Sequence, residues 1–193
     1  CTGGIDAFAM GVEEVNPDAK VLVAVTNSWF SPDDEQAASD ALIGKGCDVL
    51  AQHVDTTAPQ TASEENGTWA IGYNSDMSKE TPDATLTSVI WNWSAYYTSY
   101  VNSIVNATYD GSNYYGGMDE SLVGLTGLSS LCEDGTQEKV NEMQQKILSG
   151  EFGVFDGEIL TNDGTVIGEE GKTLDDATIT GKINWYYHNL EVV

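Results

Sequence analysis

Side chains that can hydrogen-bond or stack on a ligand stand directly after short apolar runs of this chain. Three such runs are rich in β-branched and aromatic residues: VLVAVTN (21–27), CDVLAQH (47–53) and WAIGYN (69–74). Imidazole, carboxylate, amide and aromatic groups at their ends could bind a small molecule, and an imidazole beside a carboxylate is also a component of general-base catalysis. The candidate residues after these runs are Asn27, Trp29, Phe30, His53, Asp55, Asn74 and Asp76.

Helix-patterned segments separate the three runs. The first is entered by Ser31-Pro32, a capping residue with proline at the first helical position, and ends before Gly46. The second extends from residue 57 to Asn66-Gly67. The order strand-helix-strand-helix-strand predicts a right-handed parallel unit. Ligands bind outside the carboxyl ends of the strands in open parallel sheets, so we expect the candidate residues to meet at one edge.

A catalytic role for His53 and Asp55 lacks supporting groups in the sequence. No serine or cysteine nucleophile, metal-ligand cluster or phosphate-binding loop accompanies them. Ligand binding and simple packing remain alternatives for His53. The expectation is a protein that is not an enzyme and that uses no cofactor and no metal.

The charge balance limits the classes of partner. The 193 residues include 31 acidic residues against seven lysines, with no arginine, for a formal net charge of −24. Such a chain repels phosphate backbones and anionic lipid, which excludes nucleic-acid binding. No apolar run approaches the roughly 20 residues of a membrane span. The three cysteines are too few for a disulfide scaffold, although Cys47 and Cys132 could pair in an extracellular protein.

The rest of the chain continues the alternation of helices and strands. Expected helices cover residues 5–15, a tyrosine-rich segment capped by Ser94, and a segment starting at Thr136. Expected strands cover 85–91, which ends at Trp91-Asn92-Trp93, and 122–131. A hairpin of 154–160 with 165–168 turns through Asn162-Asp163-Gly164. The fold class is α/β.

Four ordered motifs resemble one protein family. They are NSWFSP (27–32), GCDVLAQH (46–53), AIGYNSDM (70–77) and LTSVIWNWSAYY (86–97). They look like the basic membrane protein family, the substrate-binding lipoproteins of ABC transporters, several of which bind purine nucleosides or bases. The resemblance covers nearly the whole chain, but only the C-terminal half to two-thirds of such a protein.

The resemblance implies a type I periplasmic-binding-protein-like fold, in which two α/β lobes close on a ligand. Residues 1–78 would form the core of the C-terminal lobe, a parallel sheet flanked by helices. Residues 79–117 would cross into an N-terminal lobe that is largely absent here, and 118–193 would return as helix, β-hairpin and tail. The aromatic residues of the crossing segment would then be exposed or exchanged between two copies, which suggests a homodimer.

The resemblance also implies roles at the site. Trp29 occupies the position of the aromatic residue that stacks on the purine, with Phe30 beside it. Asn74, with Asp76 close by, replaces an acidic residue that holds ribose hydroxyls, and Trp91 and Asn92 stand where relatives carry a lysine. Those two departures favour a bare base over a nucleoside, since Asn74 or Asn92 could pair with adenine.

The function implied is solute binding for a bacterial ABC importer. The ligand would be a purine base or nucleoside, delivered to an ABC permease by an extracellular protein that is a cell-surface lipoprotein or periplasmic. Cys1 would then be either a lipidation site or the start of a fragment, and the fragment explains better why helix pattern begins so soon after it. The alternative is an extracellular ligand-sensing domain of a signalling receptor with the same fold.

Overall fold

The computed structural model describes all residues, 1–193, and its chain forms two compact units. The sheet unit is Thr26–Gln137, and the hairpin unit combines Cys1–Val25 with Glu138–Val193. Both units contain helices and strands, which confirms the α/β class. These boundaries differ from the ranges expected from the sequence: residues 79–117 belong to the same unit as 26–78, and the first 25 residues group with the C-terminal segment.

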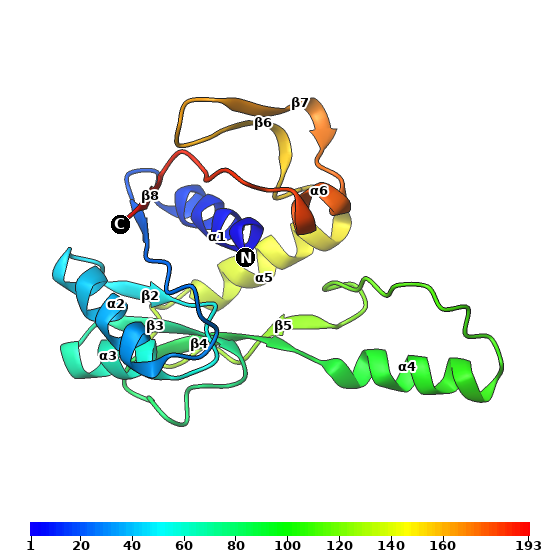
Figure 1. The fold of residues 1–193 in the computed structure, drawn as a ribbon, viewed down its shortest axis with the longest axis horizontal. Coiled ribbons are helices and arrows are strands. Elements are labelled where there is room, and N and C mark those ends of the chain that lie inside the picture. The colour runs from blue at the N-terminus through cyan, green and yellow to red at the C-terminus, as the bar shows by residue number, and fades with distance from the viewer. The chain divides into compact units, whose positions relative to one another are not determined.

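The sheet unit is built on four strands in the order β2-β3-β4-β5 (Figure 1). Strands β2 to β4 are parallel to one another, and β5 is antiparallel to β4. Helix α3 packs on β2 and β3, and α2 packs against α3. The elements are α2 (Pro32–Gly44), β2 (Val49–Ala51), α3 (Ala58–Asn66), β3 (Trp69–Asn74), β4 (Thr85–Trp91), α4 (Trp93–Val105) and β5 (Val123–Leu125).

Local sequence signals explain the boundaries of these elements. Pro32 lies in the first turn of α2, and Gly67 ends α3 with the left-handed backbone that glycine adopts at low cost. Strands β3 and β4 have the predicted bounds. A Cβ at Gly72 would lie 2.2 Å from the Ser88 hydroxyl oxygen, so the missing side chain lets β3 and β4 approach each other closely.

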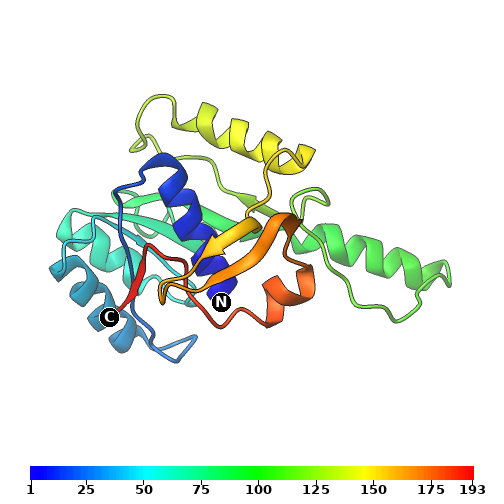
Figure 2. The ribbon, with the colours of Figure 1, turned by 90° about the horizontal axis from the view of Figure 1, so that it is seen from above.

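The hairpin unit has two small sheets. Strand β1 pairs in parallel with β8, and β6 pairs antiparallel with β7 to form the predicted hairpin. Figure 2 shows this hairpin as the paired arrows in yellow and orange. Ala9, Val23 and Leu190 form a buried apolar cluster. The elements are α1 (Thr2–Val15), β1 (Val21–Val23), α5 (Thr136–Ser149, which starts at the boundary between the units), β6 (Asp156–Leu160), β7 (Val166–Thr173), α6 (Asp176–Gly181) and β8 (Leu190–Val192).

The structure corrects several expectations about local structure. Strand β1 does not join the parallel unit with β2 and β3, because β8 supplies its partner edge. The strand expected over 122–131 is limited to Val123–Leu125, and the N-cap of α4 is Asn92 rather than Ser94. Cys47 is half-buried ahead of β2 rather than a buried strand residue, and all three cysteines are free, so the pairing left open for Cys47 and Cys132 is absent.

Polar side chains occupy much of the interior. The largest fully buried side chains include Gln60, Glu35 and Thr85 in the sheet unit and Asp6 in the hairpin unit. Gln60 donates a hydrogen bond to the backbone oxygen of Ile71 at 3.2 Å and accepts one from Gln52. Buried polar groups need such partners to offset their lost hydration, so specific hydrogen bonds fix this interior as much as apolar packing does.

Helix α4 projects away from the four-stranded sheet in both views (Figures 1 and 2). It has no buried residue, and its outer side shows a stripe of exposed apolar side chains. The chain from Ala84 to Tyr109 also carries no charged residue. None of the helices in the structure combines the length and apolarity that a membrane crossing would need. The exposed stripe comprises Trp93, Tyr97, Val101, Ile104 and Val105.

The buried carboxyl of Asp6 makes stability depend on pH. Burial raises the pKa of Asp6 from its ordinary value of 3.8 to about 6, and a hydrogen bond from the Tyr187 backbone N–H partly offsets the rise. Between these two values the folded protein holds a proton that the unfolded chain has released. The free energy of unfolding therefore falls as pH rises through this window, by up to about 3 kcal/mol.

Replacing Asp6 with Asn, which copies the neutral carboxyl, isolates this effect. We expect the stability of the parent relative to D6N to be highest below the unfolded pKa of 3.8 and to decline until the pH exceeds about 6. Urea unfolding of both proteins across this range measures the difference. A difference that stays constant with pH would mean that Asp6 titrates like an exposed carboxyl.

Candidate functional site

Backbone contacts join the first two candidate loops. The amide of Asp55 donates a hydrogen bond to the backbone oxygen of Trp29 at 2.8 Å, which holds the loop after β2 against residues 27–31. Asn27 has a left-handed backbone, with φ of 54°. The side chains of Trp29 and Phe30 are 59% and 68% exposed, so neither ring is part of the core. Two large aromatic faces are thus available beside Asp55.

A relay of side chains connects the ends of β2, β3 and β4. The Asn74 amide nitrogen donates to Oδ1 of Asp55 at 3.0 Å, and Nε1 of Trp91 donates to Oδ1 of Asn74 at 2.9 Å. Asn74 has a left-handed φ of 66°. Its amide already has one protein partner at each end, which leaves one hydrogen and one lone pair for a ligand.

Trp91 continues this relay into α4. Its ring stacks on Trp93 with centroids 5.7 Å apart and an interplanar angle of 23°. Asn92 lies between them as the N-cap of α4, and its side-chain oxygen accepts a hydrogen bond from the Ser94 hydroxyl. The Asn92 side-chain oxygen is thus occupied by Ser94, and Trp91 links the amide of Asn74 to the exposed ring of Trp93.

His53 lies half-buried after β2. Its ring packs against Tyr73 with centroids 4.8 Å apart, tilted by 53°, and Nδ1 is buried without a hydrogen-bond partner. Burial lowers the pKa of His53, so the imidazole is neutral at pH 7. A neutral ring has one donor and one acceptor nitrogen, which suits hydrogen bonding to an uncharged ligand.

Asp76 is engaged in its own turn. Its Oδ1 accepts hydrogen bonds from the backbone N–H and the hydroxyl of Ser78, and these bonds lower the pKa of the carboxyl. The side chain is therefore an anion that caps a turn, and it has no hydrogen bond to Asp55, Asn74 or Trp91.

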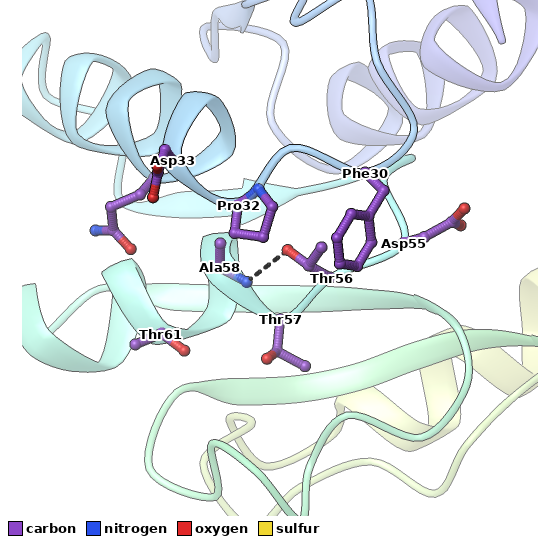
Figure 3. Close-up of a pocket in the computed structure, with 9 residues that line it drawn as sticks. Phe30, Pro32, Asp33, Asp55, Thr56, Thr57, Ala58 and Thr61 are labelled. Atoms are coloured by element: carbon purple, nitrogen blue, oxygen red, sulfur yellow. Dashed lines mark hydrogen bonds between the residues drawn. The ribbon is translucent and has the colours of Figure 1, made fainter.

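A pocket of about 590 Å³ opens between the starts of α2 and α3 (Figure 3). Phe30 and Asp55 are the two candidate residues that line it, and the Asp55 carboxylate points away from the other lining side chains. Apolar and hydroxyl groups dominate the lining, and no lysine contributes. The lining residues are Phe30, Pro32, Asp33, Gln36, Asp55, Thr56, Thr57, Ala58 and Thr61.

Sequence reasoning missed the threonines of this pocket and the buried Glu35, whose carboxylate accepts a hydrogen bond from the hydroxyl of the lining residue Thr56. A signal was present for the threonines, because Thr56 and Thr57 immediately follow Asp55 and precede a proline-containing helix start. No sequence pattern indicated that Glu35 is buried, because it follows two exposed aspartates of the same helix. No group of three or more His, Cys, Asp or Glu side chains is arranged to hold a metal ion.

Solved structures of a solute-binding protein and of a transcriptional activator share this fold. A solute-binding protein of an ABC transporter from Conexibacter woesei matches 79% of this chain and 52% of its own, with a TM-score of 0.63 and 19% identity. A transcriptional activator of the comK gene from Bacillus halodurans matches 78% of this chain and 64% of its own, with a TM-score of 0.64 and 18% identity. These similarities confirm the expected class of fold, that of periplasmic-binding-protein-like α/β proteins.

Sequence comparison then gives the family. The family described as ABC transporter substrate-binding protein, PnrA-like, matches residues 1–157, and the chain belongs to it. A purine-binding protein of Brucella abortus is 37% identical over 95% of this chain. A protein of Haloferax volcanii named as an ABC transporter glucose-binding protein is 32% identical over 79% of it. The chain spans 52% of the Brucella protein and 39% of the Haloferax protein.

Proposed function

We propose that this protein binds a purine base for a bacterial ABC importer, as an extracellular or periplasmic component. The observation that carries the proposal is the relay of Asp55, Asn74 and Trp91, which joins three strand ends, with the exposed Trp29 on the loop whose backbone accepts from the Asp55 amide. Aromatic faces and amide groups in one region suit a flat heterocycle with donors and acceptors on its edge. The purine-binding relative from Brucella supports the same ligand class.

The charge of the region favours an uncharged ligand. Asp33 and Asp55 line the pocket, and no lysine does. A phosphate group would meet these carboxylates without the cationic clamp that usually holds it. Trp91 and Asn92 at the end of β4 offer stacking and amide groups in place of a cation, which favours a base over a nucleoside.

Calorimetry against a panel of ligands tests the proposal. We expect heat of binding for adenine, hypoxanthine or guanine, weaker binding for adenosine, and none for AMP, because the phosphate adds repulsion from the carboxylates. Glucose is the comparison suggested by the Haloferax relative. Tight binding of AMP would contradict the electrostatic argument, and binding of glucose without any purine would replace the ligand class.

A sensing role would use the same capture step. The difference lies in what receives the closed, ligand-bound protein: a permease of an importer or a signalling partner. Co-purification with an ABC permease from the same organism, in the presence and absence of purine, tests the importer assignment. A complex that forms only with ligand present is expected for delivery to a transporter.

A further inference from the structure

Glu35 is the only nearly fully buried carboxylate of the sheet unit, with 1% of its surface exposed. A carboxylate removed from water must recover its lost hydration through hydrogen bonds. Both of its oxygens have partners, and these partners belong to two different loops. Glu35 is absent from the pocket lining, so contact with a ligand does not account for its burial.

One oxygen holds the start of α2 and the other reaches the start of α3. Oε1 accepts a hydrogen bond from the Ser31 backbone N–H at 2.8 Å, and Oε2 accepts one from the Thr56 hydroxyl. The Thr56 hydroxyl accepts in turn from the Ala58 N–H at 3.1 Å, the bond drawn in Figure 3. A single side chain thereby connects the ends of two loops.

Both loops contribute to the pocket. Residues 27–31 bring the exposed ring of Phe30, and residues 53–57 bring Asp55, Thr56 and Thr57. The bond from the Asp55 amide to the Trp29 oxygen is the second link between the loops. The side-chain amide of Gln52 also holds the second loop, because its Nε2 donates a hydrogen bond to the Thr56 backbone oxygen at 3.1 Å.

We propose that Glu35 is a positioning residue that fixes the loop 27–31 against the loop 53–57 and so presets the shape of the pocket. Only its consequence for purine affinity rests on the proposed function. Loops that are ordered before the ligand arrives need not be ordered by it, and this raises affinity without any direct contact to the ligand.

Hydrogen exchange in the unliganded protein tests this link directly. In Glu35→Ala, the Asp55 and Ala58 amides of the far loop should exchange about tenfold faster or more, the loss expected for a hydrogen bond to a charged group. In Thr56→Val, the Ser31 amide on the other loop should respond in the same way. Thr56→Ser keeps the hydroxyl and should restore slow exchange. At the Asp55 amide, whose own acceptor is the Trp29 oxygen in every variant, the double variant should exchange no faster than either single one, because both remove the same link.

Ser39→Ala is the matched control. The buried Ser39 hydroxyl donates to the backbone oxygen of Glu35 at 2.7 Å, so its loss weakens α2 while leaving the carboxylate in place. We expect this variant to lower the melting temperature without selectively speeding exchange at Asp55 and Ala58. Unchanged exchange at these two amides in Glu35→Ala would overturn the proposal, as would an equal acceleration in Ser39→Ala.

Adenine affinity gives a second readout. Glu35→Ala and Thr56→Val should each weaken adenine binding about tenfold, whereas Thr56→Ser and Ser39→Ala should leave it near the parent value. Adenine affinity that is the same in all five proteins would overturn the positioning role in binding. If exchange responds as expected and the parent binds no purine, the link between the loops stands and the proposed ligand is wrong.

Discussion

Replacing Trp29 with Ala is expected to weaken purine binding roughly 5- to 150-fold while leaving the melting temperature of the unliganded protein nearly unchanged. Stacking of a base on an aromatic face contributes about 1–3 kcal/mol, and each 1.4 kcal/mol corresponds to tenfold in affinity. The ring of Trp29 is 59% exposed, so its removal opens no cavity in the core. Calorimetry and thermal melting should be carried out on the 193-residue chain and on the full-length gene product if that is longer.

Trp69 offers the matched control for this substitution. It begins β3, at the end of the strand opposite Asn74, and is 38% exposed. Trp69→Ala should therefore leave purine affinity unchanged. A collapse in stability on Trp29→Ala would mean that the ring supports the fold, and Phe30 would become the stacking candidate. If neither affinity nor stability changes, the ligand does not bind at this strand end.

The isolated chain is expected to self-associate through α4 to a dimer or larger species. Association would remove an exposed apolar stripe from water, and full burial of each such side chain contributes about 1.5–3 kcal/mol of favourable free energy. The stripe consists of Trp93, Tyr97, Val101, Ile104 and Val105. The charge-free stretch from Ala84 to Tyr109 also lets two strongly acidic copies approach without facing charges. Size-exclusion chromatography with light scattering measures the mass against 20.7 kDa for one chain.

Val101→Lys should convert the assembly to monomer. A lysine reduces the net negative charge, so a general electrostatic effect would favour association, and only loss of an apolar contact explains dissociation. Val166→Lys is the control, because Val166 on β7 is equally exposed, at 55%, and lies in the hairpin unit. A monodisperse parent monomer with little ANS binding would contradict self-association.

The strands that the sequence predicted well are those with local boundary signals. Gly67 precedes β3, a Pro82-containing connector precedes β4, and both strands have the expected bounds. The predicted partner of the first run, residues 21–27, was wrong. Its β-branched residues favour a strand but do not specify which strand it pairs with. The partner of β1 is β8, about 170 residues later along the chain, and no local pattern specifies such a contact.

The proximity of three candidate residues was predictable, because they lie at or just after strand ends. Asp55, Asn74 and Trp91 come together because parallel strands place their carboxyl ends at one edge. Glu35 was not predictable, because its two acidic neighbours on α2 suggest a solvent-exposed face. Its burial depends on the hydroxyl of Thr56, which reaches it only once the two loops meet in space.

The left-handed backbone at Asn27 and Asn74 limits how the binding edge can diversify. A side chain with a branched Cβ clashes in that conformation, and asparagine, aspartate and glycine are the residues that adopt it most readily. Few residue types can therefore replace asparagine at these two positions without backbone strain. Under the proposed function, a change of ligand preference would require substitutions mainly at His53, Asp55 and Trp91, whose backbones carry no such restriction.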